Sequence, residues 1–202
     1  MPDASGRMGI EPGYDDEAPG RLWVPTGVLK TFDLSLLTGF APIEDSATAS
    51  GQVSWRHVLG STPSYVSPVG TGAANAARGW WRVPVFDNDT DSTSGTRWRV
   101  STFEVAYYRE TSSDEVEFRF YKRAAQSGAS GGGITTVNTI DATELSVDTG
   151  TWTTYSTTFI GSSYDLADGE GFFVDARMQA DASNVNARIG TCRIGVRAYV
   201  LE

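Results

Sequence analysis

The sequence has only one cysteine and one histidine in its 202 residues. A single cysteine, Cys192, allows no internal disulfide, and a single histidine, His57, cannot form a multi-histidine metal site. His57 also lacks a Gly-x-Ser-x-Gly motif that would supply a nucleophile beside it. We therefore expect no cofactor, no metal centre built on histidine and no catalytic residue in this chain.

Long apolar runs and an excess of basic residues are also missing. No run of about 18 apolar residues is present, so we expect no membrane span. Residues 1–20 lack the charged start and apolar stretch of a secretory signal, so we expect synthesis in a cytoplasm. Lys and Arg number 16 against 25 Asp and Glu, a net charge of -9, which disfavours nucleic acid as a partner.

One short acidic motif is a weak candidate for a metal site. Asp87, Asp89 and Asp91 stand at alternate positions, as in the opening of a calcium-binding loop. The match then fails, because Ser92 occupies the place of the required glycine and Trp98 the place of the bidentate glutamate. The sequence favours a solvated hairpin loop here, with calcium as the alternative.

Residues 1–30 have the composition of a disordered arm. Prolines and glycines alternate around a short acidic run, and the segment has too few apolar residues to order itself. Ile10, Tyr14, Leu22 and Trp23 are spaced as separate anchors for a groove on another subunit or protein. The sequence predicts an extended N-terminal attachment arm, and the alternative is an arm that folds back over its own sheet edge.

From residue 80 onward the chain reads as an antiparallel β-sandwich. Short β-branched and aromatic runs alternate with Gly, Asp, Asn and Ser clusters, and helix signal is almost absent. Residues 115–122 show a period of two, with Val116, Phe118 and Phe120 on one face and Glu117 on the other. Companion strands are predicted at 80–86, 97–109, 135–145, 151–160, 171–179 and 188–201.

The closing strand completes the predicted core. Cys192, Ile194, Val196 and Val200 alternate along residues 188–201, together with Ala198, so we expect a buried and inert thiol at Cys192. The domain organisation is then an arm at 1–30 and a β-sandwich domain at 31–202. Within that domain, 80–202 forms the sandwich core and 31–79 an irregular, contact-making part.

The irregular part offers apolar side chains without an assigned place. Trp55, Leu59, Tyr65 and Val66 are groups that a symmetric neighbour could cover. A sandwich of this size must also protect its edge strands, so we expect the chain to form a homo-oligomer.

Four aromatic residues are candidates for glycan binding or for an interface. Trp80 and Trp81 place one indole on each face of their strand, so one belongs to the core and the other is available. Trp152 and Tyr155 present the same choice. Core or interface packing is the default for all four, and stacking on a sugar ring is the alternative.

Two carboxylates on the strand at 115–122 have both a catalytic and a structural interpretation. Glu115 and Glu117 lie on one strand face and could imitate the carboxylate pair of a glycosidase. Arg119 follows in the same row, which favours a charged solvent face with cross-strand partners.

Residues 80–202 resemble the β-sandwich modules of tailed-bacteriophage virion proteins, namely head decoration, head fibre and tail fibre domains. The residues that carry the resemblance are VAYY at 105–108, VEFRFYK at 116–122, the GGG loop at 131–133, TWTTYSTTF at 151–159, LADGE at 166–170 and IGVRAYV at 194–200. The resemblance implies an eight-stranded jelly-roll-like sandwich, usually trimeric, displayed on a virion and without catalytic residues.

Two functions follow, from different classes. In the first, the chain is a structural protein of a bacteriophage virion that attaches through its arm to the major capsid protein or another virion protein, and decorates or reinforces the capsid or a head fibre base. In the second, it is a receptor-binding or glycan-binding module that uses exposed Trp or Tyr side chains. Binding to glycans by the purified protein distinguishes the two.

Overall fold

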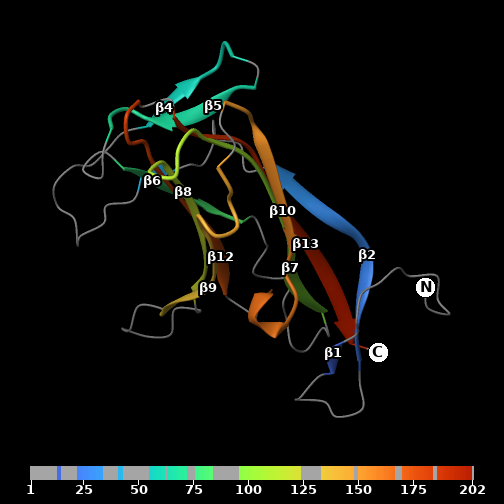
Figure 1. Ribbon diagram of the computed structural model, residues 1–202. Helices are drawn as coiled ribbons and strands as arrows, with labels where there is room; N and C mark the ends of the chain where they lie inside the picture. The colour runs from blue at the N-terminus through green and yellow to red at the C-terminus, as the bar shows by residue number, and fades with distance from the viewer. Residues whose placement is uncertain are drawn as a thin grey trace.

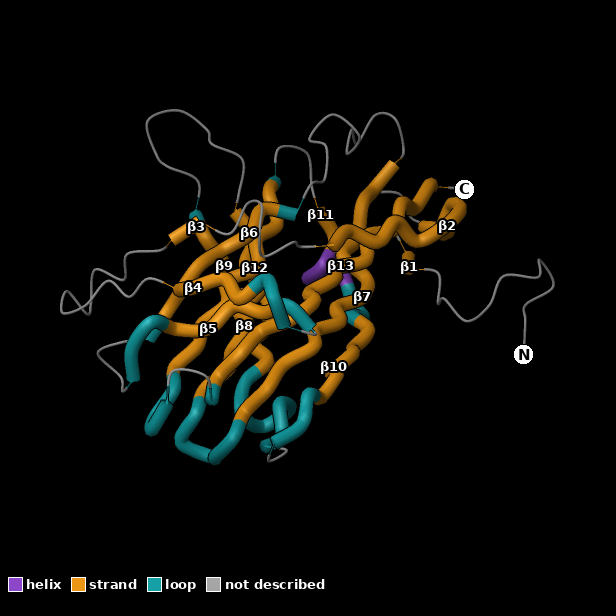
Figure 2. The backbone as a smooth tube through the Cα atoms, turned by 90° about the horizontal axis from the view of Figure 1, so that it is seen from above, coloured by secondary structure: helices purple, strands orange, loops and turns teal. Residues whose placement is uncertain are grey.

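The computed structural model describes two antiparallel β-sheets packed face to face (Figures 1 and 2). The described residues are 13–14, 22–33, 41–42, 55–61, 63–71, 76–83, 96–123, 133–147, 150–166, 170–183 and 186–201. Within them the regular secondary structure is β-strand, apart from one short 3-10 turn at Ser162–Tyr164. The predicted fold class, an all-β jelly-roll-like sandwich, is confirmed. Over these residues no helix has the length and apolar content to span a membrane.

The larger sheet is built around two long central strands, β7 (Thr96–Arg109) and β13 (Ala187–Leu201), which pair along their length. β2 (Leu22–Asp33) and β5 (Tyr65–Pro68) share the other edge of β13, and β4 (Trp55–Val58) pairs with β5. β10 (Thr153–Thr158) and β11 (Asp165–Leu166) share the far edge of β7, and β1 (Gly13–Tyr14) pairs with β2. The eight described strands therefore form a sheet in which the free edges of β13 and β7 are each shared by two strands.

The smaller sheet has five described strands in the order β3-β6-β12-β8-β9. They are β3 (Ala41–Pro42), β6 (Ala77–Arg82), β12 (Gly171–Gln179), β8 (Glu115–Arg123) and β9 (Ile134–Ile140). With the strands of the larger sheet these make thirteen described segments, more than the eight that the phage modules implied. The extra segments are short ones, such as β1, β3 and β11, that pair at the sheet edges.

The core lies between the sheets and follows the predicted alternation. Phe118 and Phe120 of β8 are fully buried, and both rings pack against Phe103 of β7 at centroid distances of 5.1 and 4.9 Å. Val116, Ile194 and Val196 are buried as predicted, and Glu117 and Arg119 point away from the core. The structure does not describe the side chain of Val200.

The alternation on β13 is interrupted by shifts in its pairing. Cys192 is fully buried, as predicted, and burial raises the pKa of its thiol well above the ordinary value, so the thiol stays protonated. The register shifts between Val196 and Ala198 against β2. As a result Ala198 is only half-buried and Tyr199 is buried in its place, which corrects the predicted period of two at this end of the strand.

The arm boundary predicted at residue 30 is wrong, because β2 begins at Leu22 and pairs with β13 as far as Asp33. Residues 22–30 therefore belong to the larger sheet, as in the alternative in which the segment covers its own sheet edge. Pro25 lies inside this strand, opposite Tyr199 of β13. Proline is found on edge strands, and β2 is an edge strand over most of its length, because among the described residues only the two-residue β1 pairs with its other side.

The part at 31–79 is also less irregular than predicted, since it contains β3, β4, β5 and the start of β6. Val66 of β5 is fully buried opposite Ile189 of β13, and Trp55 packs against the core from β4. We expected a neighbouring subunit to cover these two side chains, but other residues of the same chain cover them. Leu59 remains exposed, at 62%.

Candidate functional site

The outer face of the smaller sheet carries charged and aromatic side chains from three neighbouring strands. Strand periodicity sends every second residue of β6, β12 and β8 away from the core. Cross-strand pairing then brings these residues into rows. The outward residues are Arg78, Trp80 and Arg82 on β6, Phe173, Asp175, Arg177 and Gln179 on β12, and Glu115, Glu117, Arg119, Tyr121 and Arg123 on β8.

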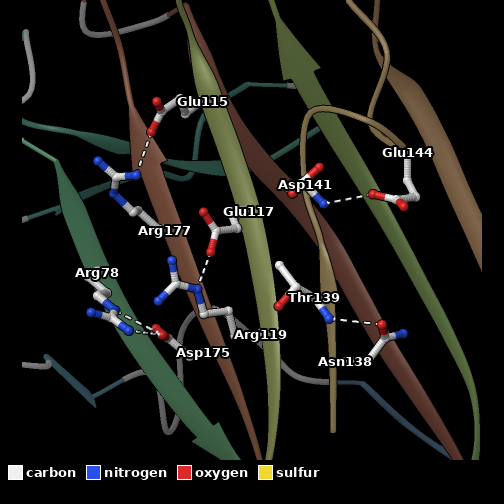
Figure 3. A network of polar contacts seen from close by, with 10 residues as sticks. All are labelled: Arg78, Glu115, Glu117, Arg119, Asn138, Thr139, Asp141, Glu144, Asp175 and Arg177. Carbon is white, nitrogen blue, oxygen red and sulfur yellow. Dashed lines mark hydrogen bonds and ion pairs between the residues drawn. The ribbon is translucent and has the colours of Figure 1, made fainter. Parts of the chain in front are cut away.

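At one end of this face, glutamates of β8 are paired with arginines (Figure 3). Glu115 forms an ion pair with Arg177 of β12 at 2.6 Å. Arg119 forms an ion pair with Glu117 on its own strand and donates a hydrogen bond to it. The hydrogen bond to Glu117 raises the pKa of Arg119 above its ordinary value. These contacts agree with the predicted charged face, since both members of the possible glycosidase pair are held by guanidinium groups.

Asp175 lies in the middle of the face and is only 2% exposed. Its Oδ2 accepts hydrogen bonds from Nε and Nη2 of Arg78 at 2.8 and 2.5 Å (Figure 3). Its Oδ1 has no hydrogen-bond partner. Burial raises the pKa of the Asp175 carboxyl, and the adjacent guanidinium of Arg78 only partly opposes this shift.

The other end of the face is aromatic. The rings of Trp80 and Phe173 pack at a centroid distance of 5.1 Å with an interplanar angle of 57°, and both side chains are half-buried. Phe173 is paired with Arg82 on one side and Tyr121 on the other, and Arg123 stands one row further along. Arg82 and Arg123 are exposed. We call these five residues the aromatic end.

The other predicted aromatic candidates divide between core and surface. Trp81 is 2% exposed and belongs to the core, so the two neighbouring indoles do point to opposite faces of β6, as predicted. Tyr155 packs against the core from β10. Neither of these two residues is placed to stack on a ligand.

Trp152 lies on the outer face of the larger sheet within a closed cluster. Its ring is 6.0 Å from the rings of both Tyr65 and Tyr108. Arg188 places its guanidinium carbon 5.0 Å from the centroid of Tyr65 and 4.3 Å from that of Tyr108. A Cβ added to Gly190 would lie 3.1 Å from Cζ3 of Trp152, so the indole rests directly on the sheet. We call this group the Trp152 cluster.

The remaining candidates lie apart from these faces. His57 is exposed on β4 and accepts a hydrogen bond from Nε1 of Trp55 at 3.2 Å. Within the described ranges, no three His, Cys, Asp or Glu side chains are grouped as metal ligands.

Several predicted residues lie beyond what the structure describes. Asp87, Asp89 and Asp91 are outside the described residues, as is Ile10. Tyr14 lies in β1 and pairs with Leu22 of β2, next to Trp23, and the side chains of these three residues are not described. The calcium motif and the anchoring role of these residues stay predictions.

Sequence reasoning found Trp80, Glu115, Glu117 and Arg119 but missed their neighbours on β6 and β12. The signal was present as alternation, with Arg-Trp-Arg at positions 78, 80 and 82 and Phe-Asp-Arg at 173, 175 and 177. Only the strand pairing shows that these two sets share one face.

Comparisons with known proteins give similarities to solved structures alone; no protein-family model and no curated protein matches the chain. One similar structure is a xylan-binding module, with 14% identity and a TM-score of 0.39, over 86% of this chain and 97% of that one. A family 11 carbohydrate-binding module from Clostridium thermocellum, in complex with a β-1,3-1,4-mixed-linked tetrasaccharide, has 18% identity and a TM-score of 0.36, over 87% and 96%. A cyclase from Fischerella has 12% identity and a TM-score of 0.34, over 89% and 90%. At these values none of them assigns a family or a function.

Proposed function

We propose that this protein is a non-enzymatic glycan-binding β-sandwich module whose ligand lies across the outer face of the smaller sheet. One observation carries the proposal. The half-buried pair of Trp80 and Phe173 adjoins a row of guanidinium and carboxylate groups on the same rigid sheet face.

This combination suits the chemistry of a sugar. The faces of a pyranose ring are apolar and pack on aromatic rings, while its hydroxyls need donors and acceptors in fixed places. Asp175 restrains Arg78 through two hydrogen bonds, so the guanidinium of Arg78 is held in position before a ligand arrives. Pre-organisation of this kind reduces the entropy lost on binding.

The same contacts support a binding role over hydrolysis. A glycosidase needs one carboxylic acid that donates a proton and one open carboxylate opposite it. Glu115 and Glu117 each form an ion pair with an arginine, and Asp175 is buried against Arg78. We therefore expect a ligand to leave this face unchanged.

Binding of the purified protein to a panel of soluble polysaccharides, measured by affinity electrophoresis and calorimetry, tests the proposal. Trp80→Ala and Phe173→Ala should each weaken binding by about tenfold or more, since an aromatic anchor is worth on the order of 1–3 kcal/mol. Trp152→Phe, on the outer face of the larger sheet, is the matched control and should bind as the unmodified protein does. Circular dichroism checks that each variant is folded.

Two results contradict the proposal. One is a protein that binds no glycan in the panel. The other is binding that survives both Trp80→Ala and Phe173→Ala, because the ligand would then occupy another face. Release of reducing sugar during these measurements would contradict the non-enzymatic part alone.

A structural role in a bacteriophage virion is the second candidate. It is supported by the sequence resemblance and by exposed apolar side chains at the β4–β5 hairpin, where Leu59 is 62% and Val69 is 49% exposed. Because β2 belongs to the sheet, the attachment segment in this candidate shortens to residues 1–21, of which Gly13 and Tyr14 form β1 and pair with β2.

Truncation tests the second candidate. A chain that begins at residue 22 should remain folded and fail to join the particle. A chain that begins at residue 31 should be destabilised as well, because it loses most of β2 and uncovers the edge of β13. Normal incorporation of the chain that begins at residue 22 would refute attachment through this segment.

A further inference from the structure

β10 is an edge strand that lacks the features that usually protect such edges. It pairs with β7 along one side, residue by residue and without a register shift, and no described strand pairs with its other side (Figure 1). Its sequence, TTYSTT, has no charged residue, no proline and no glycine. An uncharged edge with high β-propensity is a template for pairing with another strand.

The other described edge strands of more than two residues each have a protecting feature. β9 is shifted in register against β8 between Phe120 and Tyr121. β2 contains Pro25 and Lys30, and β4 is four residues long and contains Arg56. Bulges, prolines, charges and short length all hinder the addition of a further strand. Among the described edges, β10 is therefore the one best suited to accept a strand.

The pairing with β7 determines which backbone groups of β10 face the open edge. The N–H of Phe159, directly after β10, donates to the carbonyl oxygen of Ser101 at 2.8 Å. In an antiparallel ladder such hydrogen-bonded pairs recur at every second residue. The odd-numbered residues of β10 therefore direct their N–H and C=O groups to β7, and Thr154, Ser156 and Thr158 direct theirs to the open edge. The side chains of these three residues are exposed.

We propose that a second copy of this chain pairs with β10, so that the two larger sheets join into one sheet across a two-fold axis at Ser156. In this antiparallel arrangement Ser156 lies opposite Ser156 of the second copy, and Thr154 lies opposite Thr158 of the second copy. These pairs exchange hydrogen bonds through the backbone groups that face the open edge. The proposal does not depend on glycan binding, because the outer face of the smaller sheet takes no part in it.

The sequence of β10 is complementary to its own copy. Around Ser156 the outward residues read Thr, Ser, Thr in either direction, so each outward side chain meets a hydroxyl of the other copy. Cross-strand pairs of hydroxyl side chains stabilise antiparallel sheets. The same register, extended past both ends of the strand, places Ile160 opposite Trp152 of the second copy. Ile160 is 79% exposed, the most exposed large apolar side chain of the described residues, and pairing removes part of it from water.

The charges near this edge also permit two copies to approach. The chain has a net charge of -9, so two copies repel each other over most orientations. Of the β7 residues opposite the outward residues of β10, only Glu104 is charged, and it forms an ion pair with Arg193 at 3.2 Å. Across the axis the two copies of Glu104 would be three strand spacings apart, roughly 14 Å, which exceeds the Debye length of about 10 Å in ordinary buffer.

The first test is the mass of the purified chain in analytical ultracentrifugation at micromolar concentration, where we expect a dimer. Ser156→Lys places two like charges directly opposite each other on the axis and should weaken the dimer by at least about tenfold. Thr191→Lys is the matched control, because Thr191 is exposed on the central strand β13 and adds the same charge to the same sheet away from the open edge. It should remain a dimer. Circular dichroism checks that both variants are folded.

The second test examines the register with cysteines. Directly opposite residues of a hydrogen-bonded pair have Cα atoms about 5.5 Å apart, which suits a disulfide. Ser156→Cys alone should therefore form a cross-linked dimer on mild oxidation. Thr154→Cys and Thr158→Cys should each fail to cross-link alone and should cross-link when the two variants are mixed. Cys192 does not compete, because it is fully buried.

Three results overturn the proposal. One is a monomer of the unmodified chain at micromolar concentration. Another is a dimer or trimer that Ser156→Lys and Thr191→Lys affect equally, because another surface would then join the copies. The third is cross-linking of Thr154→Cys with itself, which would exclude the antiparallel two-fold register.

Discussion

The two outer faces of the sandwich carry similar residues in different arrangements. Each has a half-buried tryptophan, further aromatic rings and arginine side chains. In the Trp152 cluster the rings contact one another and enclose the guanidinium of Arg188. On the smaller sheet Trp80 has one described ring partner, Phe173, and the nearby Arg82 and Arg123 are exposed.

The difference shows that an aromatic residue on a sheet face does not by itself indicate a ligand site. Gly190 lets the indole of Trp152 approach β13 closely, so this ring serves to attach the β9–β10 connection to the sheet. Trp80 has no such role for a connecting segment among the described residues. We therefore expect changes in the Trp152 cluster to affect stability, and changes at the aromatic end to affect binding.

A substitution in the core between the two sheets should have the largest effect on the free energy of unfolding. Phe118→Ala removes a fully buried ring that contacts Phe103. It should lower the free energy of unfolding by roughly 3–5 kcal/mol, measured by urea denaturation. A cost below about 1 kcal/mol would contradict the register that places Phe118 inside and Glu117 outside.

Trp152→Ala against Trp80→Ala is the direct test of the two faces. Trp152 loses contacts with Tyr65 and Tyr108 together, and aromatic pairs are each worth about 0.5–1.5 kcal/mol beyond the area they bury. We expect Trp152→Ala to cost about 2–3 kcal/mol of stability and Trp80→Ala about 1 kcal/mol less, because it loses one such pair. Both costs are measured by urea denaturation. A larger cost for Trp80→Ala than for Trp152→Ala would contradict the structural role that we assign to Trp152.

Gly190→Ala examines the support beneath Trp152. The new methyl group would lie 3.1 Å from Cζ3 of Trp152 and 3.4 Å from the carbonyl oxygen of Ala106, so the indole has to shift. We expect a loss of about 1 kcal/mol in thermal or urea unfolding. Gly133→Ala is the matched control, because a Cβ there meets no atom within 4 Å. Equal effects of the two substitutions would show that Trp152 does not rest on Gly190.

Asp175→Asn tests how the buried carboxyl of the smaller sheet makes stability depend on pH. Burial raises the folded-state pKa of Asp175 above the ordinary value of 3.8, so the folded protein holds this proton more tightly than the unfolded chain does. The contribution of Asp175 to stability is therefore largest below pH 3.8 and declines as pH rises through the folded-state pKa.

The measurement is urea denaturation of both proteins between pH 7 and pH 4. As the pH is lowered, the unmodified protein should gain stability relative to the Asp175→Asn variant, because the asparagine side chain at position 175 does not titrate. A difference between the two proteins that stays constant with pH would show that burial does not shift the Asp175 carboxyl.

The alternation of residues along single strands was readable from the sequence. A period of two fixes which side chains share a face, so Phe118, Ile194 and Cys192 could be assigned to the core and Glu117 to the surface. The same pattern predicted that Trp80 and Trp81 would point to opposite sides. These features depend on the local backbone geometry of one strand, which needs no knowledge of its neighbours.

The pairing of strands was decided by the tertiary structure alone. Pro25 makes a strand at 22–33 look unfavourable in isolation, yet the exposed edge of β13 supplies backbone partners that outweigh this local preference. In the same way, the order β6-β12-β8 brings Arg82, Phe173 and Arg123 onto one face, although they are up to 91 positions apart in the chain. Sequence determined which side chains share a face along a regular strand, whereas long-range hydrogen bonding between strands determined which side chains meet and where the alternation breaks, as at Ala198 and Tyr199. The reason is that register is a property of pairs of strands and not of one segment.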